Sequence, residues 1–403
     1  MNHPHLAKIK NCTGCAACVD ACKKQALSMF VADDGHIYVS CDESKCVLCH
    51  QCERVCPAVN GMLYSSNTKN KSNAYSVYTT DSTIYNKSTS GGAFAAMAYH
   101  FVEDGGYVCG AVFEANEVRH IVSNKKEDIV RMQGSKYMQS SLDGVYKEIS
   151  KLLLRGIKVL FCGMGCQGAA LYSYFRGNKN RNLLYIIDMI CGGVPSALLT
   201  SSFLANEPRF KKIVGYRKKE EYVLSCLNQD GEVEYLHYRT LPVVGFGSGL
   251  TNRYSCSDCR FCGIERLSDI TIGDLWGPMG EGDMHKSVSI VHTEKGYNLM
   301  KYSKNLYAEP IDWTFIKYNY RCVLGKSINR FRLRRRLLAW NFSHLPYKIN
   351  CGLYGCNVKN PIWVAYKAYS FIVGKVESFY ISRKLDKIYN LIRKNINGKT
   401  INL

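Results

Sequence analysis

Between residues 74 and 206 the pattern of apolar and polar positions changes repeatedly from that of a strand to that of a helix. Residues 74–80 alternate as a strand does, and an apolar run at 93–102, which follows a Ser/Gly-rich loop, is predicted to be a helix. Further strands are predicted at 107–113, 118–122, 157–161 and 183–190. Helices between strands imply parallel pairing, and loops at the carboxyl ends of parallel strands converge on one crevice. The pattern therefore predicts an α/β domain.

The first 64 residues follow a different pattern. Residues 26–39 place Asp34-Gly35 between two short runs and are predicted to form a β-hairpin. A stretch rich in Ser, Asn and Lys at 60–73 is typical of a linker. The chain has 403 residues, 46% of them hydrophobic, which is enough for two or three domains.

Cysteine spacing gives this first segment its chemistry. Nine of the 20 cysteines lie between Cys12 and Cys56, and eight of them form two runs that both follow C-x2-C-x2-C-x3-C. Three cysteines two residues apart can wrap a loop around one four-iron cubane, while the fourth starts a helix and points to the other cluster. The spacing predicts a ferredoxin module with two [4Fe–4S] clusters. One cluster is assigned to Cys12, Cys15, Cys18 and Cys56, and the other to Cys22, Cys46, Cys49 and Cys52.

Zinc and disulfides are the alternatives for these cysteines. Zinc sites use paired C-x2-C motifs rather than triple repeats with a distant fourth ligand, and disulfide frameworks belong to small secreted chains. The N-terminal residues have no signal-peptide pattern, so a cytoplasmic location with reduced thiols is expected. Cys41 is out of register and is interpreted as a spare thiol, and Lys23 stands where proline is common.

Two polar loops of the α/β region are candidates for cofactor contacts. One precedes the helix at 93–102 and consists of Ser88, Thr89, Ser90, Gly91 and Gly92. The N–H groups and the positive dipole end of a helix favour phosphate there, with ordinary N-capping by a serine as the alternative. The other loop contains Ser135, Lys136 and Tyr137. A lysine beside an aromatic ring can pair with a phosphate or a flavin ring, although local sequence alone favours a surface lysine.

A third group of cysteines follows later in the chain. Cys256, Cys259 and Cys262 form a run without a local fourth member, whereas Cys166 and Cys191 lie in glycine-rich loops after predicted strands. Since those loops converge at one edge of a parallel sheet, the two distant thiols can complete a cluster with the run. A zinc knuckle from Cys256 and Cys259, and inert packing of the two distant thiols, are the alternatives.

Basic residues dominate the charge of the chain, chiefly near its C-terminal end. The formal net charge is +20, and three clusters of about −2 each would leave about +14. A basic run at 330–338 is predicted to be a helix with one apolar face. This pattern suits contact with a membrane face, with a partner or with the core. No motif in the chain indicates nucleic-acid binding. The apolar stretch at 362–373 is too short to span a bilayer.

These motifs together resemble the coenzyme F420 hydrogenase/dehydrogenase β-subunit family, fused to an N-terminal ferredoxin. The resemblance runs from about residue 73 to residue 341, through stretches at 88–92, 134–137, 160–167, 188–196 and 256–277. It implies an FAD held in the α/β domain, near a further [4Fe–4S] cluster. The departures from the family pattern are Gly165, where proline is usual, and Gly192, where a polar residue is frequent.

The resemblance also assigns residues to these cofactors. It implies flavin contacts from residues 88–92, Ser135, Lys136, Tyr137, Gly163 and Gln167. It implies cluster ligation by Cys166, Cys191, Cys256 and Cys259, with Cys262 as an extra thiol. The candidate acid–base residues are Lys136 and Asp274, because each lies in a polar loop of a matched motif.

The expected architecture has four parts. They are a ferredoxin module at 1–64, an α/β FAD-binding domain at 74–206, a C-terminal family domain at 207–341, and a basic helical tail at 342–403. The expected function is that of an iron–sulfur flavoprotein oxidoreductase. It would take electrons from a ferredoxin-type donor and reduce a two-electron acceptor, either a deazaflavin-like carrier or a small-molecule or glycan-pathway substrate. A non-catalytic relay subunit that docks on a partner enzyme is the alternative.

Overall fold

The structure is a computed structural model that describes residues 4–60, 73–219, 221–237, 240–249, 251–263, 266–275, 285–312 and 344–349. The expectations for the basic run at 330–338, the apolar stretch at 362–373 and almost all of the tail at 342–403 lie outside these ranges. Within the described residues, no helix combines the length and the apolar character needed to cross a bilayer.

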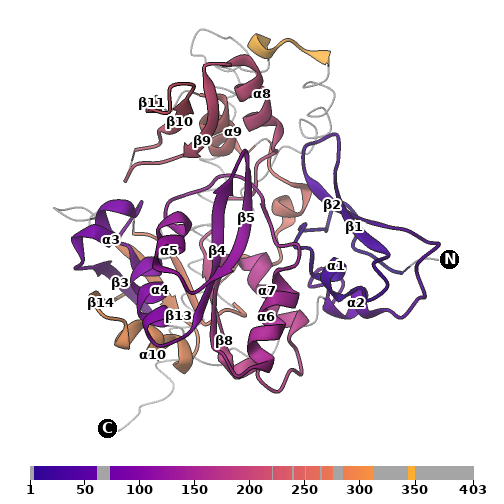
Figure 1. The fold of residues 1–403 in the computed structure, drawn as a ribbon, viewed down its shortest axis with the longest axis horizontal. Coiled ribbons are helices and arrows are strands. Elements are labelled where there is room, and N and C mark those ends of the chain that lie inside the picture. Colours follow the sequence, from indigo (N-terminus) through magenta and orange to yellow (C-terminus); the bar gives the residue numbers. More distant parts are fainter. Residues whose placement is uncertain are drawn as a thin grey trace, which may run out of the picture.

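The N-terminal module is a β-hairpin with two short helices, at the right of Figure 1. Strands β1 (Leu27–Val31) and β2 (Ile37–Cys41) pair antiparallel, and Leu27 lies opposite Cys41. Helices α1 (Ala17–Ala21) and α2 (Gln51–Val55) each begin two residues after the middle cysteine of a run and contact each other. The predicted hairpin at 26–39 is therefore present, with Gly35 in a left-handed turn at φ 72°.

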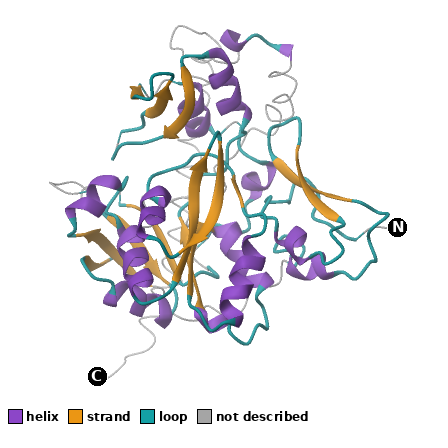
Figure 2. Cartoon of the chain, in the orientation of Figure 1, coloured by secondary structure: helices purple, strands orange, loops and turns teal. Residues whose placement is uncertain are grey.

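A nine-stranded mixed sheet forms the centre of the molecule (Figure 2). Its spatial order is β14-β3-β13-β12-β8-β7-β4-β5-β6. The strands are β3 (Asn73–Thr79), β4 (Tyr107–Glu114), β5 (Glu117–Ser123), β6 (Ser140–Ser141), β7 (Val159–Met164), β8 (Leu184–Met189), β12 (Ile270–Asp274), β13 (Ser287–Val291) and β14 (Leu306–Ile311). The sheet thus takes strands from both sides of residue 206.

Parallel pairing runs through the middle of the sheet and recurs between β5 and β6 at one edge. β4, β7, β8 and β12 run parallel, as helices between strands predict, and the carboxyl ends of β7 and β8 lie side by side. β13, β3 and β14 pair antiparallel, and β5 returns antiparallel along β4. The parallel arrangement expected from the sequence therefore holds for four central strands and for β5 with β6, where long crossovers join the strands.

Helices cover both faces of this sheet. The helices are α3 (Ser82–Lys87), α4 (Ala93–Glu103), α5 (Lys126–Met132), α6 (Val145–Leu154), α7 (Gly165–Tyr174) and α10 (Glu294–Tyr302). Strand β7 shows the two-sided burial: Leu160 packs with α4, α5 and α10, whereas its neighbour Phe161 packs with α6 and α7. Cys15 and Ala17 of the ferredoxin module join the α6–α7 core. The module is therefore packed on that layer, as Figure 1 shows.

A smaller sheet stands at the top of Figure 1. It consists of β9 (Phe210–Gly215), β10 (Leu224–Asn228) and β11 (Val233–Leu236), and it packs with α8 (Leu198–Asn206) and α9 (Leu241–Ser248). The turn of the ferredoxin hairpin reaches this part, because the Ser196 hydroxyl donates to the Asp34 carbonyl at 2.7 Å. The His36 imidazole also lies 3.1 Å from the Thr251 carbonyl oxygen.

Candidate metal centres and their surroundings

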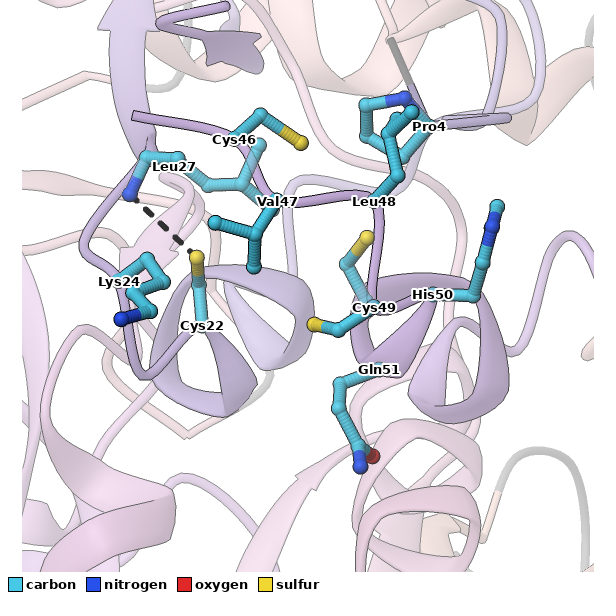
Figure 3. A pocket seen from close by; sticks show the side chains of 12 residues that line it. Pro4, Cys22, Lys24, Leu27, Cys46, Val47, Leu48, Cys49, His50 and Gln51 are labelled. Carbon is cyan, nitrogen blue, oxygen red and sulfur yellow. Dashed lines mark hydrogen bonds between the residues drawn. The ribbon is translucent and has the colours of Figure 1, made fainter. Parts of the chain in front are cut away.

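The ferredoxin module contains a cavity at its outer end, drawn in Figure 3. Its empty space is about 360 Å³, open solvent included. The cysteines that line it are Cys22, Cys46, Cys49 and Cys52. Their neighbourhood is solvent-facing: Cys49 is exposed, and Val47 and Leu48 are 58% and 39% exposed. The backbone N–H of Ala26 donates to the Cys22 sulfur at 3.3 Å, the kind of bond that stabilises a thiolate ligand.

A second cavity of about 400 Å³, open solvent included, lies nearer the α/β domain. The cysteines that line it are Cys12, Cys15, Cys18 and Cys56. Cys12 and Cys15 are buried, and Met29 and Val39 of the hairpin complete the wall. Each cavity therefore brings together the four cysteines that the spacing groups, one of them from the other run.

Two short helices carry the fourth cysteine of each run to the cavity of the other run. Cys22 is the C-terminal cap of α1 and Cys56 that of α2, so each fourth cysteine leaves its own loop and reaches the other cavity. The middle cysteine of each run is flanked by left-handed residues. They are Gly14 (φ 67°) and Ala16 (φ 60°) in the first run, and Leu48 (φ 52°) and His50 (φ 58°) in the second. The two loops therefore curve around their cavities in the same way.

The chemistry of the two sets fits iron. Burial raises the pKa of Cys15 and Cys18, and burial followed by the charge of Cys15 raises that of Cys56 to about 12. Four thiolates gathered in such surroundings require a cationic partner. Within the described ranges, no group of three or more His, Cys, Asp or Glu side chains is arranged to hold a single metal ion. Cys41 lines neither cavity, and burial and its neighbour Cys46 raise its pKa to about 11.

The third cysteine group assembles where the central parallel strands end. Cys166 opens α7 directly after β7, and Cys191 follows β8. Burial, and then the charges of Cys259, Cys191 and Cys256, raise the pKa of Cys166, so these four thiols lie near one another. The N–H of Gly193 donates to the Cys191 sulfur at 3.3 Å. The convergence predicted from the ends of the parallel strands is therefore present.

Cys262 is placed differently from the other four. Its thiol donates to the Cys259 carbonyl at 3.0 Å. Contact with Cys262, outweighing burial, and N–H groups of Phe261 and Cys262 lower the pKa of Cys259 to about 7. The lowered pKa favours the thiolate form, which is the form that binds metal.

The third group adjoins the inner cavity of the ferredoxin module. Cys15 is among the residues whose charge raises the pKa of Cys166. The Tyr146 hydroxyl, on α6, donates to the Cys15 carbonyl at 2.8 Å and holds this loop in place. The cysteine sets thus form a series from the outer cavity, through the inner cavity, to the third group at the ends of the central parallel strands.

A buried ion pair supports the third group. Arg266 donates to the Asp188 carboxylate at 3.3 Å and to the Gly263 carbonyl at 2.9 Å. A Cβ atom on Gly165 would lie 2.5 Å from the Arg266 guanidinium, which explains why glycine stands where proline is usual. Asp188 also accepts a hydrogen bond of 2.5 Å from Thr271, which ties β8 to β12 beneath the cysteines.

The two polar loops singled out in the sequence lie against each other. The Thr89 and Ser135 hydroxyl oxygens are 3.3 Å apart, and the Gln133 amide donates to the Ser88 hydroxyl at 2.8 Å. Ser90 and Gly91 are turned towards β13 instead: the Ser90 hydroxyl donates to the Lys286 carbonyl at 2.9 Å and the Gly91 N–H to the Ser287 hydroxyl at 3.0 Å. Gly92, at φ 79°, precedes α4, whose first turn has no side-chain cap.

Lys136 and Asp274, the candidate acid–base residues, are both held by protein groups. The Lys136 ammonium donates to the carbonyls of Met132, Gln133 and Gly134 at 3.1, 2.9 and 3.2 Å and so caps the end of α5. Burial lowers its pKa to about 7. The Asp274 carboxylate accepts a hydrogen bond of 2.6 Å from buried Arg217.

The remaining flavin candidates have structural contacts. Tyr137 stacks on Phe246 of α9 with ring centroids 3.8 Å apart, and so joins the large sheet to the smaller one. The Gln167 amide oxygen accepts a hydrogen bond of 2.8 Å from the Met164 N–H, and a Cβ atom on Gly163 would lie 2.6 Å from that oxygen. Trp276 and Gly277, at the end of the matched stretch, lie outside the described residues.

Sequence reasoning missed the residues that attach the module to the domain. They are Asp20, Gln139, Tyr146 and Arg253. Each contacts a residue more than 100 positions away, as Gln139 does when its amide donates to the Gly14 carbonyl at 3.3 Å. One signal was present in the sequence: an arginine three residues before the Cys256 run, at a position that the fold buries.

Two cysteine-lined cavities on a ferredoxin hairpin, packed against an α/β domain that gathers a third cysteine group, define an iron–sulfur electron-transfer protein. Residues 11–60 match the family model of the 4Fe-4S dicluster domain. Residues 156–312 match the model for the C terminus of the coenzyme F420 hydrogenase/dehydrogenase beta subunit. These matches confirm the resemblance in two stretches: residues 11–60 are similar to the dicluster ferredoxin domain, and residues 156–312 to the C terminus of the F420 hydrogenase/dehydrogenase beta subunit.

Among solved structures, one from the F420-reducing [NiFe] hydrogenase complex of Methanosarcina barkeri is similar to this chain. The identity is 18% and the TM-score 0.43, over 67% of this chain and 88% of that chain. No curated protein matches the chain in sequence.

Proposed function

We propose that this protein is an iron–sulfur flavoprotein oxidoreductase. It takes electrons from a ferredoxin-type donor at the outer cavity and delivers them to a two-electron acceptor in the α/β domain. The acceptor is a deazaflavin-like carrier or a small molecule of a glycan pathway. When bound, the clusters supply one-electron transfer, and FAD exchanges single electrons for a pair.

One observation supports this proposal most directly: the three cysteine sets adjoin one another, and the outer set opens to solvent at Cys49. Cys49 in the outer set is exposed, Cys15 in the inner set is buried, and Cys15 lies near Cys166 of the third set. We assign the outer cluster to Cys22, Cys46, Cys49 and Cys52, the inner cluster to Cys12, Cys15, Cys18 and Cys56, and a third cluster to Cys166, Cys191, Cys256 and Cys259. The exposed outer end suits an external donor.

The residues around the sets hold them and adjust their charge. N–H groups of Ala26 and Gly193 donate to ligand sulfurs and so stabilise negative charge on them. The Arg266–Asp188 pair fixes the ends of β7 and β8, from which Cys166 and Cys191 project.

The proposed FAD site is the region where the two polar loops meet. The uncapped first turn of α4 and the hydroxyls of Thr89 and Ser135 provide donors suited to a pyrophosphate. Ser88, whose hydroxyl donates to the Ile84 carbonyl, borders them. Lys136 adds a positive charge beside them and, with a pKa near 7, is able to hold or release a proton there. Tyr137 follows Lys136 in the chain, Gly163 lies at the end of β7, and Gln167 lies in the first turn of α7. We assign all three to the same site.

A relay subunit without its own substrate is the second candidate. The observation in its favour is that both acid–base candidates already have partners inside the protein. Lys136 donates to three carbonyls, and Asp274 is paired with Arg217. In that case a partner enzyme would accept electrons from the third set, and the isolated chain would turn over no substrate.

Cofactor content separates the two candidates. We would purify the full chain anaerobically and measure iron, sulfide and released flavin per polypeptide. About twelve irons with about one FAD supports the reductase, since that content matches three four-iron clusters and a flavin. About eight irons without flavin, even after FAD is added, leaves the ferredoxin module alone and favours the relay.

A further inference from the structure

Arg253 begins the segment that carries the third cysteine group, but its side chain lies against the ferredoxin module. Only 1% of its surface is exposed. Its guanidinium donates to the Cys12 carbonyl at 3.0 Å and to the Ile37 carbonyl at 2.5 Å. It also donates to the Gln139 side-chain oxygen at 2.6 Å and lies 4.7 Å from the centre of the Tyr38 ring. One side chain thus joins the inner cysteine loop, the hairpin and the α/β domain.

None of these partners carries a negative charge. Among the residues that the structure describes, the other two buried arginines are paired with carboxylates, Arg217 with Asp274 and Arg266 with Asp188. Within the described part of the chain, no Asp or Glu lies within ion-pair distance of Arg253, and the Asp34 carboxylate accepts its hydrogen bond from Tyr38 instead. A buried guanidinium keeps its proton, and without an anion nearby it is costly.

The inner cavity provides the anion that this guanidinium lacks. Cys12, whose carbonyl it contacts, lines that cavity with Cys15, Cys18 and Cys56. A [4Fe–4S] core with four thiolates carries about −2 when oxidised and one more negative charge when reduced. The low dielectric around a buried pair makes such an attraction stronger than it is in water.

We propose that Arg253 raises the reduction potential of the inner centre above that of the outer centre, and so makes the inner centre the electron acceptor of the two. A fixed positive charge stabilises the reduced form more than the oxidised form, because the reduced form is more negative. The step is a one-electron exchange: the outer centre is oxidised by one electron, the inner centre is reduced by one, and no bond forms or breaks. This inference rests on the assignment of the two ferredoxin clusters, but on neither the third cluster nor FAD.

The chain contains a matched control for this role. Arg54 donates to the Cys49 carbonyl at 3.1 Å, as Arg253 does to that of Cys12, but Arg54 is exposed. Water and salt screen an exposed charge, so Arg54 is expected to have little influence on the outer centre. The two arginines therefore separate the effect of a buried charge from that of a hydrogen bond to a ligand backbone.

The test is an anaerobic redox titration of the full chain, followed by electron paramagnetic resonance, for wild type, Arg253→Gln, Arg253→Lys and Arg54→Gln. Cys49→Ser, which removes an outer ligand, identifies which signal belongs to which centre. For Arg253→Gln we expect the ratio of reduced to oxidised inner centre, at a given potential, to fall at least tenfold. This corresponds to a midpoint potential lower by about 59 mV for one electron. Arg253→Lys should keep most of the wild-type value, and Arg54→Gln should leave both couples unchanged.

A second variant keeps the test decisive if Arg253→Gln fails to hold its clusters. Gln139→Glu would place a carboxylate beside the guanidinium without removing Arg253. It should lower the midpoint potential of the inner centre, as Arg253→Gln does. Full iron content with an unchanged inner couple in either variant would overturn the proposal. The iron count reports separately on the proposed function: about eight irons would remove the third centre while leaving this inference standing.

Discussion

The Asp20 carboxylate of the ferredoxin module accepts a hydrogen bond of 3.0 Å from the backbone N–H of Tyr146 in the α/β domain. Its other oxygen accepts one from the Gly144 N–H, also at 3.0 Å. Gly144 is the N-terminal cap residue of α6 and has no side chain to offer, so Asp20 caps the helix from another module. In the opposite direction, the Tyr146 hydroxyl of the domain donates a hydrogen bond to the Cys15 carbonyl of the module. This pair of residues fixes the inner cysteine loop on the domain.

Replacing Asp20 should therefore weaken the attachment of the module. We expect Asp20→Ala to lower the free energy of unfolding by about 1–2 kcal/mol, the usual effect of losing an N-terminal cap. Urea denaturation of the anaerobic protein measures this, with Asp33→Ala, an exposed acid on the hairpin turn, as the control. Equal midpoints for the two variants would mean that Asp20 does not carry the attachment.

Removing Cys166 should affect the third centre alone. We expect Cys166→Ser to lose about four of about twelve irons while the ferredoxin signals remain. Cys109→Ala is the control, because Cys109 is a buried thiol that packs in the α6–α7 core. Iron content that stays at the wild-type level in Cys166→Ser would exclude Cys166 as a ligand.

Tyr137 should contribute through its ring rather than its hydroxyl. The stack on Phe246 joins the two sheets, so Tyr137→Ala should cost about 3 kcal/mol of stability, as loss of a large aromatic side chain does. Tyr137→Phe keeps the ring and should be nearly neutral. Thermal or urea unfolding measures both variants, and flavin content measured alongside them tests the proposed cofactor contact. A Tyr137→Ala protein as stable as wild type would contradict the packing argument.

Acid should destabilise the protein partly through His120. This imidazole stacks on Phe161 at 5.2 Å, and its Nε2 lies 3.0 Å from the Cys162 carbonyl oxygen. Burial lowers its pKa to about 4, against about 6.5 in an unfolded chain. Between these values the unfolded chain binds a proton that the folded chain does not. Stability is thus fully present above pH 6.5 and falls by about 1.4 kcal/mol per unit as the pH drops towards 4.

His120→Gln should remove this share of the pH dependence. Urea unfolding at pH 7.0, 6.0 and 5.0 should give a slope smaller by about one proton than that of wild type. His50→Gln, at the exposed N-terminal cap position of α2, is the control variant. If His120→Gln shows the wild-type slope, the imidazole must already be protonated in the folded protein.

The parts of the site that the sequence predicted are those set by local spacing. Cysteines two residues apart must face one cavity, and a short helix must carry the fourth cysteine away, so the grouping of Cys56 with Cys12 follows from neighbours in the chain. The approach of Cys166 and Cys191 followed from the rule on parallel strand ends.

Other parts depended on contacts that no local pattern encodes. The antiparallel pairing of β13 and β14 with β3 joins segments more than 200 residues apart, and nothing in residues 74–80 indicates which strands will flank them. Arg253 is an ordinary arginine in the sequence, and only the packed module gives it a buried position. Asp274 looked available for catalysis because its partner Arg217 is 57 positions away.

The position of β3 between β13 and β14 also sets an order of events during synthesis on the ribosome. This strand is the first of the large sheet to emerge, yet neither edge has its partner until residue 291 has been made, and the second edge waits for residue 311. Unpaired strand edges can bind chaperones or pair with strands of another chain. All eight cysteines of the two ferredoxin sets, by contrast, have been made by residue 56. Iron can therefore be loaded into the first 60 residues while the rest of the chain is still being translated.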